Sequence, residues 1–170
     1  QAAAYRLFHG RTALLKYHYY LCTLRYQAMV AEIDGFEQFD LTEKFSNFTY
    51  VLFDLFAEER EFVEATFDEL VFRSPSKTLF QRQLEEIFAG FLANGTTLPA
   101  AVTTAIPSLA SPQYLKLVRH WLHDESAGAE ETLALADKTI AFAAEALQSR
   151  LWSTGADLAR YLLGTAVPGR

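Results

Sequence analysis

The stretch EKFSNFTYVLFDLFAEEREFVEATFDELVFR, residues 43–73, decides the fold class. Its apolar residues recur at intervals of three and four, which is the spacing of one face of an α-helix. In the first half these positions are Phe45, Phe48, Leu52, Leu55 and Phe56. A group of acidic residues beginning at Glu58 then suits the positive end of a new helix dipole. The stretch therefore predicts two consecutive helices, at about 42–57 and 58–73.

Helical spacing continues on both sides of this stretch. A long helix is predicted at about 11–33 and ends at Asp34-Gly35, because glycine is favoured just past a helix end. Further helices are predicted at about 75–93, 98–105, 112–124, 127–150 and 154–164. No alternating strand pattern of useful length appears. We therefore predict an all-α bundle of about seven to eight helices, forming a single domain over residues 1–170.

Composition and charge exclude several classes of protein. Lysine and arginine number 15 against 21 aspartate and glutamate, for a formal net charge of −6. Nucleic-acid binding usually draws on a basic patch, and no window here carries a basic run. A single cysteine excludes an intrachain disulfide framework. Neither an apolar run of about 18 residues nor a signal peptide appears, so we expect no membrane span and a cytoplasmic location.

No motif points to catalysis or to a bound metal. Ser74-Pro75-Ser76-Lys77 fits a Ser-x-x-Lys pattern, but the partner motifs of that chemistry are absent. The densest group of potential metal ligands is His120, His123, Asp124 and Glu125. Their spacing matches neither the zinc nor the di-iron helical motifs. Cys22 has no obvious base and is interpreted as a small apolar filler. We expect no enzyme activity, no cofactor and no metal.

Aromatic residues are the unusual feature of the composition. The chain holds 14 Phe, most of them between residues 36 and 91. Two interpretations stay open: the rings fill a helical core, or they surround a ligand in a pocket half at about 11–124, since ligand pockets are mostly apolar and aromatic. In the second interpretation the pocket residues are Tyr20, Tyr50, Phe53, Phe67 and Phe91. Tyrosine hydroxyls, His18, Asn47 and Arg60 would supply its polar groups.

The last two predicted helices, at about 127–164, differ from the rest. The first of them is rich in alanine, and small side chains let helices approach closely. Its apolar face packs either within the chain or against the same two helices of a second subunit. For the second case the predicted dimer interface is Leu133, Ala136, Ile140, Ala143, Leu147, Leu158, Tyr161 and Leu162.

An acidic all-helical domain with these features resembles the ligand-binding and dimerisation domain of TetR-family transcriptional regulators. The stretch at 43–73 resembles the helices that line the effector pocket in one subfamily. HWLHDESAGAEETLALADKTIAFAAEAL at 120–147 and ADLARYLLG at 156–164 resemble its final helices, which form a four-helix bundle across the dimer axis. These segments cover about half of the chain. The resemblance implies a homodimer that binds a small hydrophobic effector.

The family's DNA-reading helix-turn-helix is not visible in this sequence. YRLFHGRTALL at 5–15 resembles the junction at which such a domain ends, and the chain starts at Gln1, so we expect an N-terminal piece to precede it. DNA would be contacted only through that piece. The leading hypothesis is the effector-sensing module of a repressor, in which a ligand alters the spacing of two DNA readers. The alternative is a TetR-shaped lipid- or isoprenoid-binding accessory protein without DNA binding.

Overall fold

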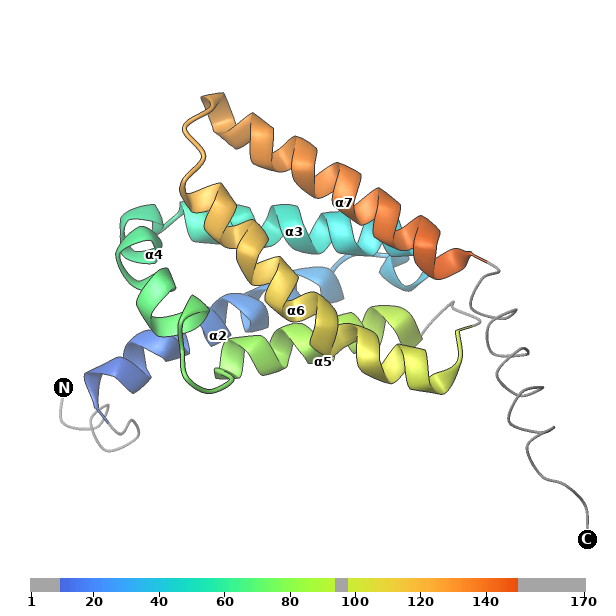
Figure 1. Cartoon of the computed structure of the whole chain (residues 1–170), viewed down its shortest axis with the longest axis horizontal. Helices are drawn as coiled ribbons and strands as arrows, with labels where there is room; N and C mark the ends of the chain where they lie inside the picture. Colours follow the sequence, from blue (N-terminus) through green and yellow to red (C-terminus); the bar gives the residue numbers. More distant parts are fainter. Residues whose placement is uncertain (1–9, 94–97, 150–170) are drawn as a thin grey trace, which may run out of the picture.

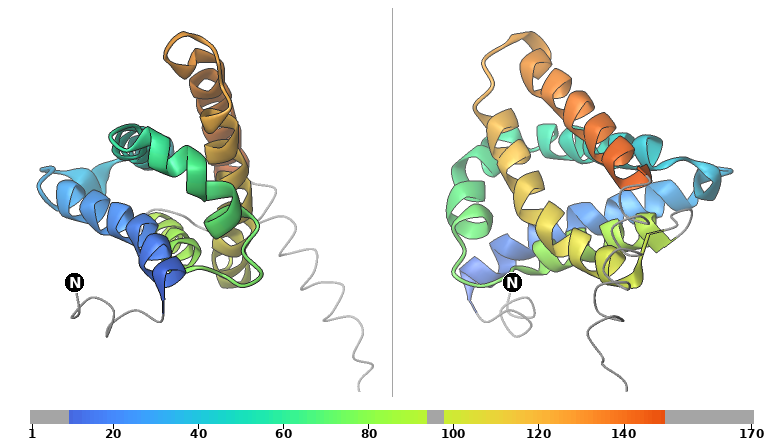
Figure 2. Two further views of the ribbon diagram at one scale, coloured as in Figure 1. Left: turned by 90° about the vertical axis from the view of Figure 1, so that its left-hand side faces the viewer. Right: turned by 45° about the vertical axis from the view of Figure 1, so that its right-hand side comes forward.

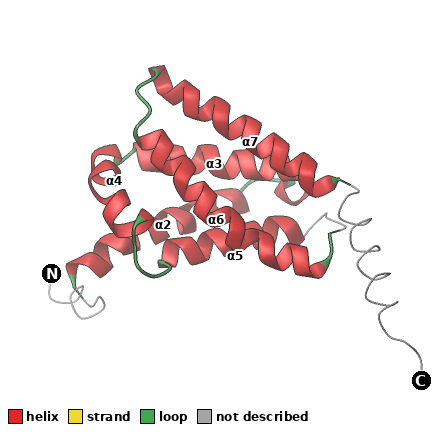
Figure 3. Ribbon diagram, in the orientation of Figure 1, coloured by secondary structure: helices red, strands yellow, loops and turns green. Residues whose placement is uncertain are grey.

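Helices make up the part of the chain that can be described. In a computed structural model, the described residues 10–93 and 98–149 form six α-helices and no strand (Figure 1, Figure 3). The helices are α2 (Arg11–Ala31), α3 (Leu41–Ala57), α4 (Arg60–Phe67), α5 (Leu79–Ala93), α6 (Ala100–Leu122) and α7 (Glu130–Gln148). The all-α prediction is confirmed. The helix predicted at 154–164 lies outside the described residues.

Helix α3 begins at a capping box. Asp40 Oδ1 accepts a hydrogen bond from the Glu43 backbone N–H at 2.8 Å, and Glu43 Oε2 accepts one from the Asp40 backbone N–H at 2.8 Å. Two N–H groups at the start of the helix are thereby satisfied. Before the cap, Gly35 has a φ of 79°, a left-handed conformation that glycine adopts without steric cost. These local features define the turn from α2 into α3.

The segment predicted as one helix at 58–73 divides into two parts. Helix α4 ends at Phe67, and a π-helical turn, η2 (Asp68–Phe72), follows it. Within this turn the Arg73 backbone N–H donates to the Asp68 carbonyl at 2.9 Å. The Asp68 carboxylate lies 2.9 Å from Nε of Arg119 on α6. Apolar spacing alone does not distinguish a π turn from an α turn, so the sequence predicts one continuous helix here.

The two helices predicted at about 98–105 and 112–124 are one helix, α6. It contains Pro107 and Pro112, and a proline inside a helix removes a hydrogen bond and costs about 3 kcal/mol. Pro107 is buried, and α6 packs along α5. This packing outweighs the cost of the prolines. The local Ser-Pro pattern predicts a helix start and does not reveal the packing.

The contacts between helices show how the bundle is arranged. Helices α2, α3 and α5 pack on one another, while α6 lies along α5, and α7 packs on α3 and α6 (Figure 1, Figure 2). In the described ranges, no helix is both long enough and apolar enough to cross a membrane. Together these helices enclose the hydrophobic core.

Aromatic rings form much of the core. Tyr19 lies 5.8 Å from Phe56 and 5.9 Å from both Phe67 and Phe80, measured between ring centroids. A second group comprises Phe48, Phe88 and Tyr114, with centroids 5.2–5.7 Å apart. Such separations are typical of favourable aromatic pairs. Many of the phenylalanines therefore pack against each other and not around an empty pocket.

Candidate ligand-binding cavity

A cavity of about 470 Å³ lies between α3, α5, α6 and α7. Ligand pockets in proteins commonly have volumes of about 300–1,000 Å³. Most of the wall is apolar and consists of Phe45, Phe88, Ile106, Ala110, Leu117, Leu135, Ile140, Ala143 and Leu147. The polar lining residues are Thr49, Gln113, Tyr114, Lys116, His120 and Thr139. This combination of an apolar wall and a few polar groups is typical of a site for a small hydrophobic molecule.

The inner end of the cavity is closed by buried residues of three helices. Thr49, Phe88 and Tyr114 are all buried. The Thr49 hydroxyl donates to the Phe45 carbonyl at 2.8 Å, so it is already paired. Among the described residues the Tyr114 hydroxyl has no hydrogen-bond partner, and burial raises its pKa, against a smaller lowering by the nearby Thr49 hydroxyl. The inner end is therefore mostly apolar, with the Tyr114 hydroxyl as an unpaired polar group, and it is unsuited to a charged group.

The outer end of the cavity carries polar groups on one face of α6 and also Thr139 on α7. Gln113, Lys116 and His120 are exposed, and their spacing of three and four places them along one side of the helix. Lys116 Nζ donates to Gln113 Oε1 at 3.1 Å. The cavity thus has an apolar interior and a polar mouth.

A chain of hydrogen bonds positions His120 at this mouth. His120 Nδ1 lies 2.8 Å from the Thr132 hydroxyl, and that hydroxyl donates to Asp124 Oδ2 at 2.6 Å. Asp124 also accepts hydrogen bonds from the backbone N–H and the hydroxyl of Ser126, at 2.9 and 2.5 Å. The hydrogen bonds from Ser126 and Thr132 hold the pKa of Asp124 well below its usual range. Asp124 therefore ties the end of α6 to the first turn of α7.

None of the five residues predicted to bind the ligand lines this cavity. Phe67 is fully buried in the aromatic core, and Tyr20 is partly exposed on α2 with its ring 5.3 Å from Tyr17. Phe91 lines a separate hollow beside the end of α2. Periodicity identifies the apolar face of each helix, but it does not show that α7 completes the wall of the cavity.

Tyr50 and Phe53, two of those five, line a second hollow of about 470 Å³. The Phe53 ring stacks on Trp121, with centroids 5.0 Å apart and planes 13° from parallel. The guanidinium of Arg60 lies 4.7 Å from the centroid of the same Trp121 ring. The Tyr50 hydroxyl donates to Asp137 on α7. These side chains are already paired with one another, which makes the first cavity the better candidate.

The predicted dimer residues on α7 differ in burial within the single chain, from the buried Ala136 to the exposed Ala143. Ala136 is fully buried within a single chain, so it has no surface to give to a partner. Ile140, Ala143 and Leu147 line the cavity, and Leu133 packs against the core. Leu158, Tyr161 and Leu162 lie outside the described residues. The leucine and isoleucine of the seven-residue repeat therefore lie on the side of α7 that contacts the core and lines the cavity, and their role in a dimer stays a prediction. Phe142 is 73% exposed on another face.

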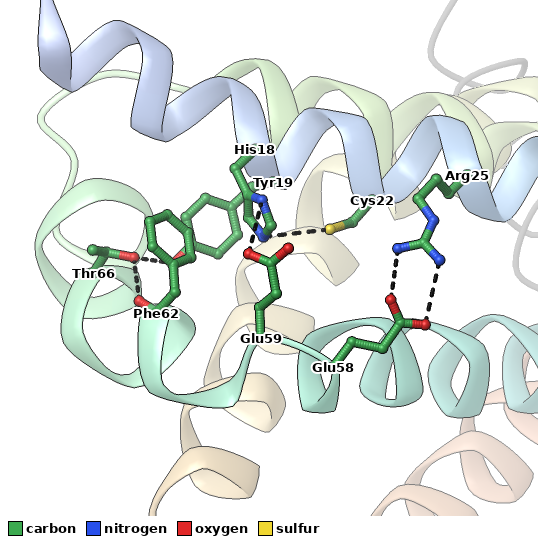
Figure 4. Close-up of polar contacts among 8 residues, drawn as sticks. All are labelled: His18, Tyr19, Cys22, Arg25, Glu58, Glu59, Phe62 and Thr66. Carbon is green, nitrogen blue, oxygen red and sulfur yellow. Dashed lines mark hydrogen bonds and ion pairs between the residues drawn. The ribbon is translucent and has the colours of Figure 1, made fainter.

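Cys22, His18 and Glu59 adopt the order of a nucleophile, a base and an orienting acid (Figure 4). His18 Nε2 lies 3.8 Å from Cys22 Sγ, and His18 Nδ1 lies 3.8 Å from Glu59 Oε2. His18 precedes Cys22 by one helical turn, so this neighbour could have been found from the sequence. Burial raises the pKa of the Cys22 thiol to about 11, and burial also lowers the pKa of His18. The thiol is therefore protonated and unreactive near neutral pH.

Potential metal ligands do not gather in the described part of the chain, where no group of three such side chains forms a site. His120 and His123, which are close in the sequence, each form a hydrogen bond with another part of the chain. His120 bonds to Thr132, and His123 Nδ1 lies 2.7 Å from the Arg119 carbonyl.

The chain matches a known protein family. The family described as "Tetracyclin repressor-like, C-terminal domain" matches residues 44–162, which is more than half of the chain. This range contains most of α3 and all of α4 to α7, and so includes every wall of the cavity. A comparison with curated protein sequences finds no match. By the extent of this match and by its all-helical fold, the chain belongs to the family of tetracycline-repressor-like C-terminal domains.

Proposed function

We propose that this chain is the effector-sensing and dimerisation module of a TetR-like transcriptional repressor. Domains of this family are generally ligand-binding and non-enzymatic. The observation that carries the proposal is the apolar cavity of about 470 Å³ between α3, α5, α6 and α7. Its occupant is a small hydrophobic effector. No cofactor and no metal take part.

A ligand in this cavity would act on the position of α6 and α7. Both helices form its wall, and α7 is attached to α6 through Asp124. A ligand shifts a conformational equilibrium only by its difference in affinity for the two states. Filling the space between α6 and α7 favours the arrangement in which the two helices stand further apart.

Side-chain contacts connect α6 with α2, so a movement of α6 can be transmitted to α2. Arg119 on α6 pairs with Asp68 in η2, which continues α4. The Tyr19 hydroxyl on α2 lies 2.7 Å from the Thr66 hydroxyl on α4. Helix α2 begins at Arg11, the end of the domain at which an N-terminal DNA reader would join. Polar contacts therefore connect the wall of the cavity with the helix that would carry the reader.

The homodimer is part of this proposal. Helix α7 buries one face on α3 and α6 and exposes another face that includes Phe142. A large apolar side chain left this exposed is available to form part of an interface. We place the dimer contact on this face of α7, together with the predicted helix at 154–164. DNA is contacted only through a reader outside this chain.

Binding of a neutral apolar fluorophore, N-phenyl-1-naphthylamine, tests the proposal. We expect saturable binding with a blue-shifted emission. The substitution Ala110→Phe fills the cavity with an uncharged ring and should weaken binding by about tenfold or more. Ala101→Phe is the matched control, because Ala101 is exposed on the same helix and does not line the cavity. The proposal would be overturned if neither substitution changed the affinity for the fluorophore, or if the fluorophore did not bind at all.

A further inference from the structure

We propose that the ligand of this cavity has an apolar body and one hydroxyl group, most favourably a phenol, which donates to His120 and accepts from Lys116. This inference rests on the proposed function, since it assumes that the cavity holds a ligand. It adds the polar chemistry by which the ligand is selected. Three observations carry it: the charge of the lining, the direction of the hydrogen bonds around His120, and the division of the cavity into an apolar interior and a polar mouth.

The lining carries a positive side chain and no carboxylate. Lys116 is a lining residue, and no aspartate or glutamate is among the residues that line the cavity, although the chain has 21 of them. An ammonium group has three hydrogens to donate, and one of those of Lys116 is directed to Gln113. A ligand amine would be repelled here, whereas an oxygen acceptor would be attracted.

Asp124 fixes the direction of the hydrogen bonds that lead to His120. Its Oδ2 accepts from both the backbone N–H and the hydroxyl of Thr132, at 2.7 and 2.6 Å. Because the pKa of Asp124 is well below its usual range, the carboxyl is ionised and can only accept. The single hydrogen of the Thr132 hydroxyl is therefore used on Asp124.

The proton of the His120 ring follows from this arrangement. Since Thr132 uses its hydrogen on Asp124, its oxygen can only accept from His120 Nδ1 at 2.8 Å. Nδ1 of His120 therefore carries the proton, and in the neutral ring Nε2 is an acceptor. Among the described residues Nε2 has no hydrogen-bond partner. At the mouth, which Gln113 and Thr139 also line, His120 Nε2 is thus an acceptor and Lys116 Nζ a donor.

A hydroxyl group matches this pair, because it donates one hydrogen bond and accepts others. A carboxylate only accepts, so it would face the lone pair of His120 Nε2. An ether or a ketone also only accepts. A phenol places its ring in the apolar interior beside Phe45 and Phe88 and leaves its hydroxyl at the mouth. Its acidic hydrogen makes it a stronger donor than an alcohol, and Lys116 favours the negative charge that develops on its oxygen.

A series of ligands with one apolar body tests the inference. The three are 4-butylphenol, 4-butylanisole and 4-butylbenzoate, each measured by displacement of N-phenyl-1-naphthylamine from the chain. We expect 4-butylphenol to bind about tenfold more tightly than 4-butylanisole, which has the same body but no hydrogen to donate. Equal affinities of phenol and anisole, or tighter binding of benzoate, would overturn the inference and leave the proposed function standing. Absence of binding by the fluorophore itself would overturn the proposed function.

Substitutions assign the preference to the named residues. His120→Phe should remove the advantage of phenol over anisole and leave the affinity for anisole unchanged. Lys116→Met should weaken both, because an ether oxygen also accepts from Lys116. Thr132→Val should reduce the phenol advantage, and Thr132→Ser should restore it, since serine keeps the hydroxyl. A phenol advantage that persists in a folded His120→Phe chain would contradict the assignment, with folding checked by circular dichroism and by fluorophore binding.

Discussion

Arg119 on α6 and Asp68 in the π turn η2 form an ion pair in which Nε and Oδ1 are 2.9 Å apart. The pair joins a helix that lines the cavity to the segment that continues α4. Its two side chains are about one-third exposed, at 39% and 32%, so solvent weakens their attraction. The contact therefore joins the two helices and contributes modestly to stability.

The substitution Asp68→Asn tests this connection. We expect it to lower the free energy of unfolding by about 1 kcal/mol, because it weakens two partly screened ion pairs of Asp68, with Arg119 and with Arg73. Urea unfolding followed by circular dichroism measures the change. Arg25→Ala is a suitable control, since it breaks the exposed Arg25–Glu58 pair and should change stability little. If the free energy of unfolding fell by no more than in the control, the ion pairing of Asp68 would not stabilise the fold.

The cap of α3 gives a second prediction about stability. Asp40→Ala removes the side-chain acceptor of the capping box and should cost about 1 kcal/mol. The same unfolding measurement applies, with Asp34→Ala as the control, because Asp34 is exposed and caps no helix. An effect equal to that of the control would mean that the cap contributes nothing to the start of α3.

The Cys22 thiol should resist alkylation in the folded chain. Its pKa is raised to about 11 by burial, so at pH 8 only about one thiol in a thousand is the reactive thiolate. Iodoacetamide labelling followed by mass spectrometry should show slow reaction in buffer and rapid reaction in urea. Labelling in buffer as fast as that of a free thiol would contradict the burial of this group.

The same shift has a consequence for stability against pH. Because the folded pKa lies above the ordinary value of 9.0, folding favours the protonated thiol. This contribution is complete below pH 9.0 and is lost as the pH rises toward 11. Between pH 9.0 and 11, the free energy of unfolding should therefore fall less in the Cys22→Ser chain than in the unsubstituted chain, as measured by urea unfolding.

The placement of the dimer contact gives a prediction about assembly. If the proposed contact is made by Phe142, which is 73% exposed in the single chain, Phe142→Glu should convert a dimer into a monomer, because it puts a charge into that apolar contact. Leu109→Glu is the matched control, since Leu109 is 68% exposed on α6 and lies outside the proposed interface. Light scattering at micromolar concentration measures both. A Phe142→Glu chain that stays dimeric would move the interface elsewhere.

Local signals in the sequence predicted the helices well. The start of α3 at Leu41 lies within one residue of its predicted start, because the Asp40 cap and the apolar spacing are both local features. The division of α6 at Ser111-Pro112 was wrong, since packing on α5 overrides the proline signal. Local patterns thus fix where most helices form, and tertiary packing decides whether two of them join.

The cavity could not be predicted in this way. Ile140 and Leu147 have the spacing of an interface, and their face is indeed apolar. Whether such a face meets a second subunit or the same chain depends on how α7 lies on α3 and α6. The aromatic residues chosen for the pocket, such as Phe67, are large enough to pack against each other and close the space between them.

In the proposed function, a ligand in the cavity changes the spacing of the two α2 helices in a dimer. A spin label at Thr12, introduced as Thr12→Cys in a Cys22→Ser chain, reports that spacing, because Thr12 is exposed at the start of α2. Pulsed electron resonance measures the distance between the two labels with and without saturating N-phenyl-1-naphthylamine. The account predicts a change of about 2 Å or more, comparable to known helix shifts in switching proteins. An unchanged distance distribution in a dimer that binds the fluorophore would contradict it.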